Sequence, residues 1–410
     1  MDIETIQEIL HEILKPKIGE ITDIRVDNLL DTLENFVGVL RRVRFHFKYD
    51  NLEKEYDLVL KYRNSVNDNP GMSTLWEKEV DAYNIILPAL MEFQKNTSEK
   101  VEIFSPNIHY CNKERCALIM DNLKPLGFSM ADKSNGLKLN ETIFVAKKIA
   151  RFHAISLGYM NAYGIEKFNN DYQESLKDFL YDFHKAMAVS MESAQKEFME
   201  EIVKRLSEMF PDDISIIHDM NRHYESSHLP KNFEEFCGIG ETCSVINHGD
   251  LWTNNIMIKY DDGDPIDLRF IDFQAIKLSS PASELCYFIW MSTSAEVLLN
   301  NTEEILKSYF EEFLKTADLY KISLSYTLEE LKAEFEHFYD VGFRTRFQTL
   351  LVFNTESSSD PIEVDVTTFL DQDKSEEVKS FAEKMFANAS YNAYYKMIEL
   401  CRYGKKLNIF

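Results

Sequence analysis

The sequence has no excess of basic residues and no long apolar run. Its 45 lysines and arginines face 69 aspartates and glutamates, which gives a formal net charge of −24. This balance argues against binding to nucleic acid or to an anionic membrane surface, because both need a positively charged face. No apolar run approaches the roughly 18 residues that a membrane-spanning helix requires. We therefore expect no nucleic-acid partner and no membrane partner.

The sequence also lacks a secretory signal and a zinc-ligand spacing. Residues Met1 to Leu14 place apolar side chains at helical spacing among acidic ones, unlike the basic and apolar regions of a signal peptide. The six cysteines fall at no spacing typical of zinc ligands, so we expect reduced thiols and a cytoplasmic protein. We find no internal repeat and no low-complexity linker.

Length and hydrophobicity predict two lobes. The chain has 410 residues, of which 45% are hydrophobic, and this is enough for a large packed core. Apolar and polar residues alternate at strand spacing in the first third, over residues 20–26, 39–49, 55–63, 101–110 and 115–123. Between these strands, Leu75 to Phe93 shows helical spacing, and we expect Pro88 to kink or end that helix.

The pattern becomes mainly helical from Asn140 onward, with predicted helices at residues 294–316, 327–347 and 374–403. One hairpin pattern interrupts it between Asn247 and Gln274. We therefore predict an α+β protein with a small β-rich N-terminal lobe, residues 1–123, and a larger, mostly helical C-terminal lobe, residues 124–410.

The segment Asn247 to Gln274 carries the residues with the clearest chemistry. It reads NHGDLWTNNIMIKYDDGDPIDLRFIDFQ, with four residues between Asp250 and Asn255 and with Asp272 after a second apolar strand. This order matches the H-x-D-x-x-x-x-N and D-F pattern of kinases. Phosphoryl transfer needs a carboxylate that accepts the hydroxyl proton and oxygen ligands for Mg²⁺, which keeps several waters. The segment can supply both.

The motifs together resemble the ecdysteroid kinase-like family, a branch of the choline kinase and aminoglycoside phosphotransferase group within the protein-kinase-like fold. The resemblance is carried by HGDLWTNNIMI and IDFQ, and extends upstream to ENFVG at residues 34–38, DLVLKYR, WEKEVDAY and LIMDNL. It covers most of the chain up to the helix after Asp272 and is weaker in the last hundred residues. It implies a two-lobed kinase with ATP and Mg²⁺ as cofactors.

The resemblance also implies a role for single residues. Asp250 would be the catalytic base, and His248 would brace the loop that carries it. Asn255 and Asp272 would bind Mg²⁺. The nucleotide would be bound by Asn35 and Gly38 of the phosphate loop, by Lys61 with its partner Glu79, and by backbone groups of Asp121 and Leu123 at the hinge.

Glu77 is a rival to Glu79 as the partner of Lys61, because residues two apart face different sides of a helix. The family places a tyrosine four residues beyond this glutamate, where Tyr83 stands, and we therefore favour Glu79. Departures from the kinase pattern are Gln274 in place of the D-F-G glycine and the lack of an A-P-E segment, so we expect no protein substrate. Glu284 stands where the family has aspartate, and its effect on the loop is open.

The predicted activity is ATP-dependent phosphorylation of a hydroxyl on a small molecule, which the resemblance narrows to an ecdysteroid, a related steroid or a xenobiotic alcohol. Aromatic residues that could line the acceptor pocket are Trp252, Trp290, Tyr339 and Phe343, although such residues are more often core. Two alternatives remain. One is a choline- or ethanolamine-type kinase, which an acidic and aromatic pocket would favour, and the other is a catalytically weak binding protein. The oligomeric state is open.

Overall fold

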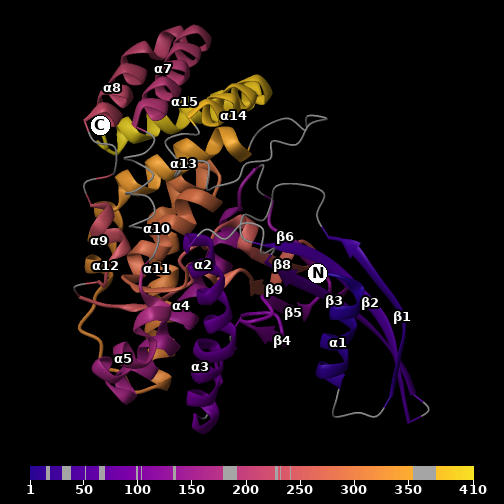
Figure 1. Cartoon of the computed structure of the whole chain (residues 1–410). Coiled ribbons are helices and arrows are strands. Elements are labelled where there is room, and N and C mark those ends of the chain that lie inside the picture. Colours follow the sequence, from indigo (N-terminus) through magenta and orange to yellow (C-terminus); the bar gives the residue numbers. More distant parts are fainter. Residues whose placement is uncertain are drawn as a thin grey trace.

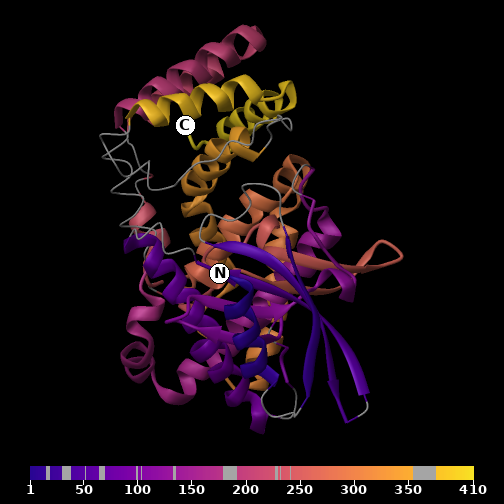
Figure 2. The same cartoon turned by 45° about the vertical axis from the view of Figure 1, so that its right-hand side comes forward.

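The computed structural model describes residues 1–14, 19–29, 38–50, 52–63, 70–97, 100–102, 104–132, 135–178, 192–226, 230, 232–240, 242–353 and 375–410. Figure 1 and Figure 2 show the strands of the N-terminal part gathered apart from the helices α7, α8, α14 and α15, which lie together at the opposite end. Among the described residues, no helix combines the length and the apolar character needed to cross a bilayer.

The N-terminal part is built on an antiparallel five-stranded sheet in the order β1-β2-β3-β5-β4. Its strands are β1 (Glu20–Asn28), β2 (Val39–Tyr49), β3 (Leu52–Tyr62), β4 (Ile108–Asn112) and β5 (Ala117–Asp121). Helix α1 (Ile3–Leu14) packs its apolar residues against one face, which includes Phe45 and Leu60. Since side chains alternate across a strand, the neighbouring Val59 and Lys61 face the other side.

The predicted helix Leu75–Phe93 lies within a longer helical stretch that changes geometry twice. It consists of α2 (Pro70–Asp81), a π-helical turn η1 (Ala82–Ile86) and α3 (Leu87–Phe93), with Pro88 in the first turn of α3. Pro88 has no N–H to donate to the carbonyl of Asn84, and its ring crowds that carbonyl. The regular α-helical hydrogen bonding is therefore interrupted just before the proline.

The fourth strand is shorter than predicted. β4 begins at Ile108 rather than at Val101. The backbone of Val101 is bonded instead by the Gln94 side chain, at 2.5 Å to its N–H and 2.8 Å to its carbonyl. Pro106 has no N–H for a sheet ladder. The described residues 101–102 and 104–107 thus precede the sheet as a connecting segment.

The C-terminal part is mainly helical, with two small sheets. The sheets are β6 (Phe128–Met130), β8 (Ile256–Asp261) and β9 (Asp264–Phe270) in one, and β7 (Val245–Asn247) with β10 (Lys277–Ser279) in the other. The long helix α4 (Leu139–Tyr163) packs against α11 (Ala295–Leu319). The remaining helices are α5 (Ile165–Leu176), α7 (Glu192–Met209), α8 (Ile214–Glu225), α9 (Phe233–Cys237), α10 (Pro281–Ser292), α12 (Leu328–His337), α13 (Tyr339–Phe353), α14 (Ser375–Asn388) and α15 (Tyr391–Lys406).

The predicted α+β class, with a small β-rich part followed by a larger helical part, is confirmed. Two predicted helices are each divided in two, because α12 ends before Phe338 and Ser390 starts α15 by accepting a hydrogen bond from the N–H of Ala393. The proposed boundary between Leu123 and Lys124 falls between β5 and β6.

Candidate active site

The loop that follows β7 places Asp250 beside the small sheets. Its turn requires glycine at position 249, where φ is +84° and an added Cβ atom would lie 2.0 Å from the carbonyl oxygen of Ala275. No side chain fits there, and a left-handed φ suits glycine. The loop can therefore run close beside the segment after β9 and bring Asp250 near Asp272.

The carboxylate of Asp250 is held at both oxygens. Tyr287 donates its hydroxyl to Oδ1 at 2.7 Å, and the amide of Asn255 donates to Oδ2 at 3.1 Å and to the Asp250 carbonyl at 2.7 Å. Burial raises the pKa of Asp250 to about 7, with the Tyr287 hydrogen bond opposing the shift and the charge of Asp272 adding to it. A carboxyl group with a pKa near neutrality is suited to accept a proton.

His248 joins the loop to the end of β9. Its Nε2 donates to the carbonyl of Ile271 at 2.9 Å, and its Nδ1 accepts the N–H of Asp250 at 3.4 Å. These partners require a neutral imidazole with the proton on Nε2. Burial lowers the pKa of His248, in agreement with that state. His248 therefore positions the backbone of Asp250, and its ring has no hydrogen bond to the carboxylate.

Glu284, whose effect on the loop the sequence left open, supports the loop directly. Its carboxylate accepts the N–H groups of His248 at 2.9 Å and Gly249 at 2.8 Å, and bonds Nε2 of His153 at 3.0 Å. Nδ1 of His153 in turn bonds the hydroxyl of Tyr309 at 2.8 Å. Burial tends to raise the pKa of Glu284, but the His153 hydrogen bond and charge outweigh it and lower the pKa.

The sequence did not single out His153 and Tyr309. The sequence showed His153 only as a histidine within the apolar stretch of a predicted helix. Such a residue is usually a satisfied core histidine, and its partner Glu284 lies 131 positions away.

Replacing Glu284 with glutamine should destabilise the fold. An amide offers one acceptor oxygen where the carboxylate offers two, so at least one of three buried donors loses its partner. We expect the free energy of unfolding in urea to fall by about 3 kcal/mol, as when one partner of a buried ion pair is removed. The control is Glu77→Gln, which breaks an exposed pair with Lys113 and should cost below about 1 kcal/mol. Equal losses in the two variants would refute this role.

Three distant segments meet at Lys61. Its Nζ lies 2.7 Å from Glu79 Oε2 on α2 and 2.9 Å from Asp272 Oδ1, which follows β9. Lys61 is 3% exposed and Glu79 is 1% exposed. Burial disfavours the charged lysine, but the attraction of the two carboxylates prevails and raises the pKa of Lys61. Glu77 points instead to Lys113 at 2.8 Å, so Glu79 is the glutamate that pairs with Lys61.

A pocket opens beside this ion-pair cluster. Six of the predicted site residues line it: Lys61, Glu79, Asp121, Leu123, Asn255 and Asp272. Apolar side chains complete its wall, namely Leu29, Leu40, Val59, Met120, Met130, Met257 and Ile271. Gly38 lies just outside, and a Cβ atom added to it would be 3.3 Å from Cγ of Lys61. Asn35 lies outside the described residues.

The pocket offers oxygen ligands suited to Mg²⁺. Asp272 has a left-handed backbone, with φ 66° and ψ 62°, which is uncommon for a residue other than glycine. The amide nitrogen of Asn255 donates to Asp250, which leaves its oxygen as a possible ligand. Within the described part of the chain, no three His, Cys, Asp or Glu residues cluster as a metal site. Mg²⁺ on nucleotide phosphates needs only one or two protein carboxylates with waters, and the Asn255 and Asp272 oxygens fit that requirement.

The two hinge residues use part of their backbone internally. The N–H of Asp121 donates to the carbonyl of Asn107 at 3.0 Å, and the Leu123 carbonyl accepts from Leu126 and Phe128 at 3.1 and 3.2 Å. The Asp121 carboxylate is bonded by Asn107 at 2.7 Å. The N–H of Leu123 is thus the hinge group that could donate a hydrogen bond to a nucleotide base in the pocket.

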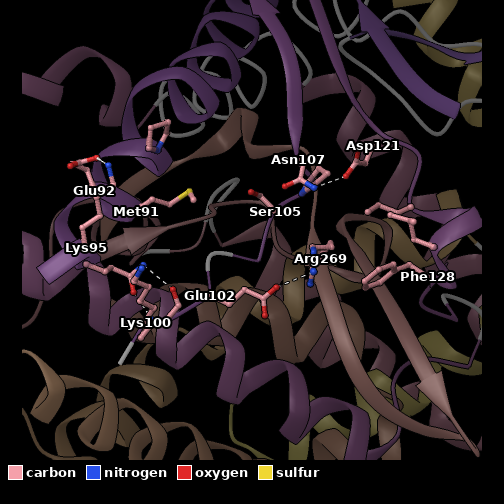
Figure 3. Close-up of a pocket in the computed structure, with 16 residues that line it drawn as sticks. Met91, Glu92, Lys95, Lys100, Glu102, Ser105, Asn107, Asp121, Phe128 and Arg269 are labelled. Carbon is pink, nitrogen blue, oxygen red and sulfur yellow. Dashed lines mark hydrogen bonds and ion pairs between the residues drawn. The ribbon is translucent and has the colours of Figure 1, made fainter. Parts of the chain in front are cut away.

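A second cavity, of about 620 Å³, is lined by residues that include Asp121, Glu102 and Arg269 (Figure 3). It shares Asp121 and Leu123 with the pocket beside Lys61 but contains none of the other predicted site residues. Two pairs of its charged side chains form ion pairs, Arg269 with Glu102 at 2.9 Å and Lys95 with Glu92 at 2.5 Å. Its size suits a ligand, but Lys61, Asp250 and Asp272 do not line it, and we do not place the reaction there.

Comparisons with known proteins place the chain in a family. The model of the ecdysteroid kinase-like family matches residues 32–322. Similar solved structures include a choline kinase from Cryptosporidium parvum Iowa II, with 13% identity, a TM-score of 0.47 and coverage of 93% of this chain and 96% of that one. Another is the GDP complex of aminoglycoside 2′-phosphotransferase-IIIa, with 13% identity, a TM-score of 0.41 and coverage of 95% and 99%.

No curated protein sequence matches the chain. The family match, by contrast, spans well over half of the 410 residues and includes the strand with Lys61, the loop with Asp250 and the segment with Asp272. Membership of that family supports a small-molecule kinase. The protein belongs to the ecdysteroid kinase-like family.

Proposed function

We propose that this protein transfers the γ-phosphoryl group of ATP to a hydroxyl of a small, largely apolar molecule, such as an ecdysteroid, a related steroid or a xenobiotic alcohol. The observation that supports this most is the meeting of Lys61, Asn255 and Asp272 in one pocket, with Asp250 bonded to Asn255 at its edge. These are the charged and polar groups that phosphoryl transfer to an alcohol needs.

We place the boundary between the two lobes between Leu123 and Lys124. The nucleotide would occupy the pocket between the lobes. Lys61 binds the α and β phosphates, and Glu79 orients it through their ion pair. Asn35 and Gly38 belong to the loop over the phosphates, and backbone groups of Asp121 and Leu123 bind adenine. Asn255 and Asp272 would hold Mg²⁺, which would neutralise phosphate charge when bound.

Asp250 accepts the proton of the acceptor hydroxyl. Its two oxygens accept hydrogen bonds from Tyr287 and from Asn255, which lie on different elements. The carboxylate is therefore held in one orientation in which it can accept the proton. His248 and Glu284 act through the loop backbone and are positioning residues. A protein that only bound small molecules would have no chemical need for both this base and the magnesium ligands.

A screen of acceptors tests the proposal. The full chain is incubated with Mg²⁺ and ATP and with hydroxysteroids, apolar alcohols, choline or ethanolamine, and each acceptor is examined by mass spectrometry for the gain of one phosphoryl group. We expect phosphorylated steroids or apolar alcohols. If no acceptor gains a phosphoryl group although the protein binds Mg²⁺ and ATP, the transfer reaction is refuted.

A further inference from the structure

The surroundings of Asp250 define the side from which an acceptor can approach. Its Oδ2 faces Asn255, which lines the nucleotide pocket, while its Oδ1 faces the hydroxyl of Tyr287 on α10. In phosphoryl transfer the attacking and leaving oxygens lie in line on opposite sides of the phosphorus, so the acceptor must approach from the side away from the nucleotide. The acceptor therefore extends along α10, on the side that Tyr287 marks.

Helix α10 has one accessible strip, and it begins at this point. Every residue from Pro281 to Ser292 is buried except Tyr287 and Met291, which are partly exposed. Residues four apart lie on the same helical face, about 6 Å from one another along the axis. Met291 contacts the hydroxyl of Thr349 on α13 at 3.7 Å. A molecule with its hydroxyl at Asp250 can thus lie over Tyr287 and Met291 and reach α13.

Arg346 stands at the far end of this strip. It comes one turn before Thr349 on α13, is partly exposed, and donates Nη1 to the carbonyl of Trp290 at 2.6 Å. Within the described residues we find no carboxylate paired with it. Two other arginines of the C-terminal part differ, since Arg344 bonds Asp340 at 2.8 Å and Arg402 bonds Asp213 at 2.6 Å. Although the chain carries a net charge of −24, Arg346 thus has no acidic partner among the residues that the structure describes.

A second cation approaches the same place from α15. Burial lowers the pKa of Lys396, the charge of Arg346 lowers it further, and Asp132 opposes the shift. Burial lowers the pKa of Arg346 itself to about 10, and among the described residues only Tyr403, not a carboxylate, acts to raise it. The positive charge of Arg346 is therefore left for a group from outside the described chain to neutralise.

The plainest structural explanation is that Arg346 only caps α10. The carbonyl of Trp290 is among the last four of that helix and needs a donor. One N–H of Arg346 meets this need, whereas guanidinium carries five in a planar fork that suits a carboxylate. A cap alone leaves most of these donors and the charge unused.

We propose that Arg346 binds an anionic group, a carboxylate or a sulfate, on an acceptor whose hydroxyl lies at Asp250. This inference rests on the proposed phosphotransferase function and narrows its substrate class to hydroxylated apolar acids. It also argues against a choline-type acceptor, because a quaternary ammonium group lying along α10 would approach Arg346 and be repelled.

The test compares a hydroxysteroid carboxylate with its methyl ester, and with choline, as acceptors for the full chain with Mg²⁺ and ATP. We expect kcat/KM for the carboxylate to exceed that for the ester by about tenfold, a scale set by one charge-assisted bidentate contact. Arg346→Gln should remove this advantage mainly through KM, and Arg346→Lys should restore part of it. Arg402→Gln carries the same change of charge away from α10 and should leave both substrates unaffected.

Two results would overturn the inference while leaving the phosphotransferase function intact: equal use of acid and ester by the wild type, or an equal loss for both substrates in Arg346→Gln, as a cap alone would give. If no acceptor is phosphorylated, the phosphotransferase function is refuted. The role of Arg346 is then tested by measuring ligand binding. Thermal stabilisation of the wild type by the steroid carboxylate, lost in Arg346→Gln, would then support the anion site, and no stabilisation would refute it.

Discussion

Replacing Asp250 with asparagine should lower the rate of phosphoryl transfer by about 10²-fold or more while Mg²⁺-dependent ATP binding is retained. The loss follows from removing a general base. Binding should survive because Asp250 does not line the pocket beside Lys61, where we propose that the nucleotide binds. An asparagine can also accept from Asn255 and donate to the Tyr287 hydroxyl. Turnover and nucleotide affinity are measured on the same preparation. Turnover close to the wild-type value would exclude Asp250 as the base.

The pH dependence of the wild type provides an independent check on this base. Because the pKa of Asp250 is raised to about 7, kcat/KM should fall as the pH is lowered through about 7 and the carboxylate becomes protonated. The Tyr287 hydrogen bond lowers this pKa, so Tyr287→Phe should move the acid limb to higher pH. A profile in Tyr287→Phe that coincides with the wild type would contradict the assignment.

Replacing Asp272 with alanine should abolish the magnesium-dependent part of the thermal stabilisation by ATP. In the wild type, a ligand present at about 100 times its Kd stabilises the fold by about 2.7 kcal/mol. The variant loses a carboxylate of the proposed metal site but keeps the contact between Lys61 and Glu79 at 2.7 Å, so the pocket should persist. Differential scanning fluorimetry with ATP, with and without Mg²⁺, measures the effect.

Asp267→Ala is the matched control for this measurement. Asp267 also belongs to the β9 region, but it bonds Arg269 at 2.7 Å and does not line the nucleotide pocket. Its removal should leave the magnesium-dependent shift at the wild-type value. A normal shift in Asp272→Ala would remove Asp272 from the metal site.

With an anion site at Arg346, the protein would prefer an acceptor that carries an acid group over a simple apolar alcohol. A half-buried guanidinium at the end of a mostly apolar strip favours a molecule with a hydroxyl at one end and an acid at the other. Such molecules arise when an alcohol or aldehyde group of a hydroxylated apolar compound is oxidised to a carboxylate, or when one of several hydroxyls is sulfated. Enzymes of these classes would supply the substrate.

Local spacing was enough to predict the loop that carries Asp250. His248, Asp250 and Asn255 lie within eight consecutive positions, so their mutual arrangement is set largely by one turn and by Gly249. Apolar periodicity likewise predicted the strands of the five-stranded sheet, the hairpin of β8 and β9 and most helices, because it reports which face of each element is buried. The short strands β6 and β10 were not predicted. The break at Phe338 was missed, as were the start of β4 and the break at Ser390, which depend on side-chain hydrogen bonds of Gln94 and Ser390.

By itself, therefore, the sequence determined the α+β class, the candidate base and the candidate metal ligands. Only the tertiary structure decided that Glu79 rather than Glu77 meets Lys61, that Glu284 bonds the loop together with His153, and that Arg346 lies at the end of the α10 strip. The physical reason is that these contacts join residues 18 to 131 positions apart. Their geometry is fixed by how helices pack on sheets and on one another, which no local pattern encodes.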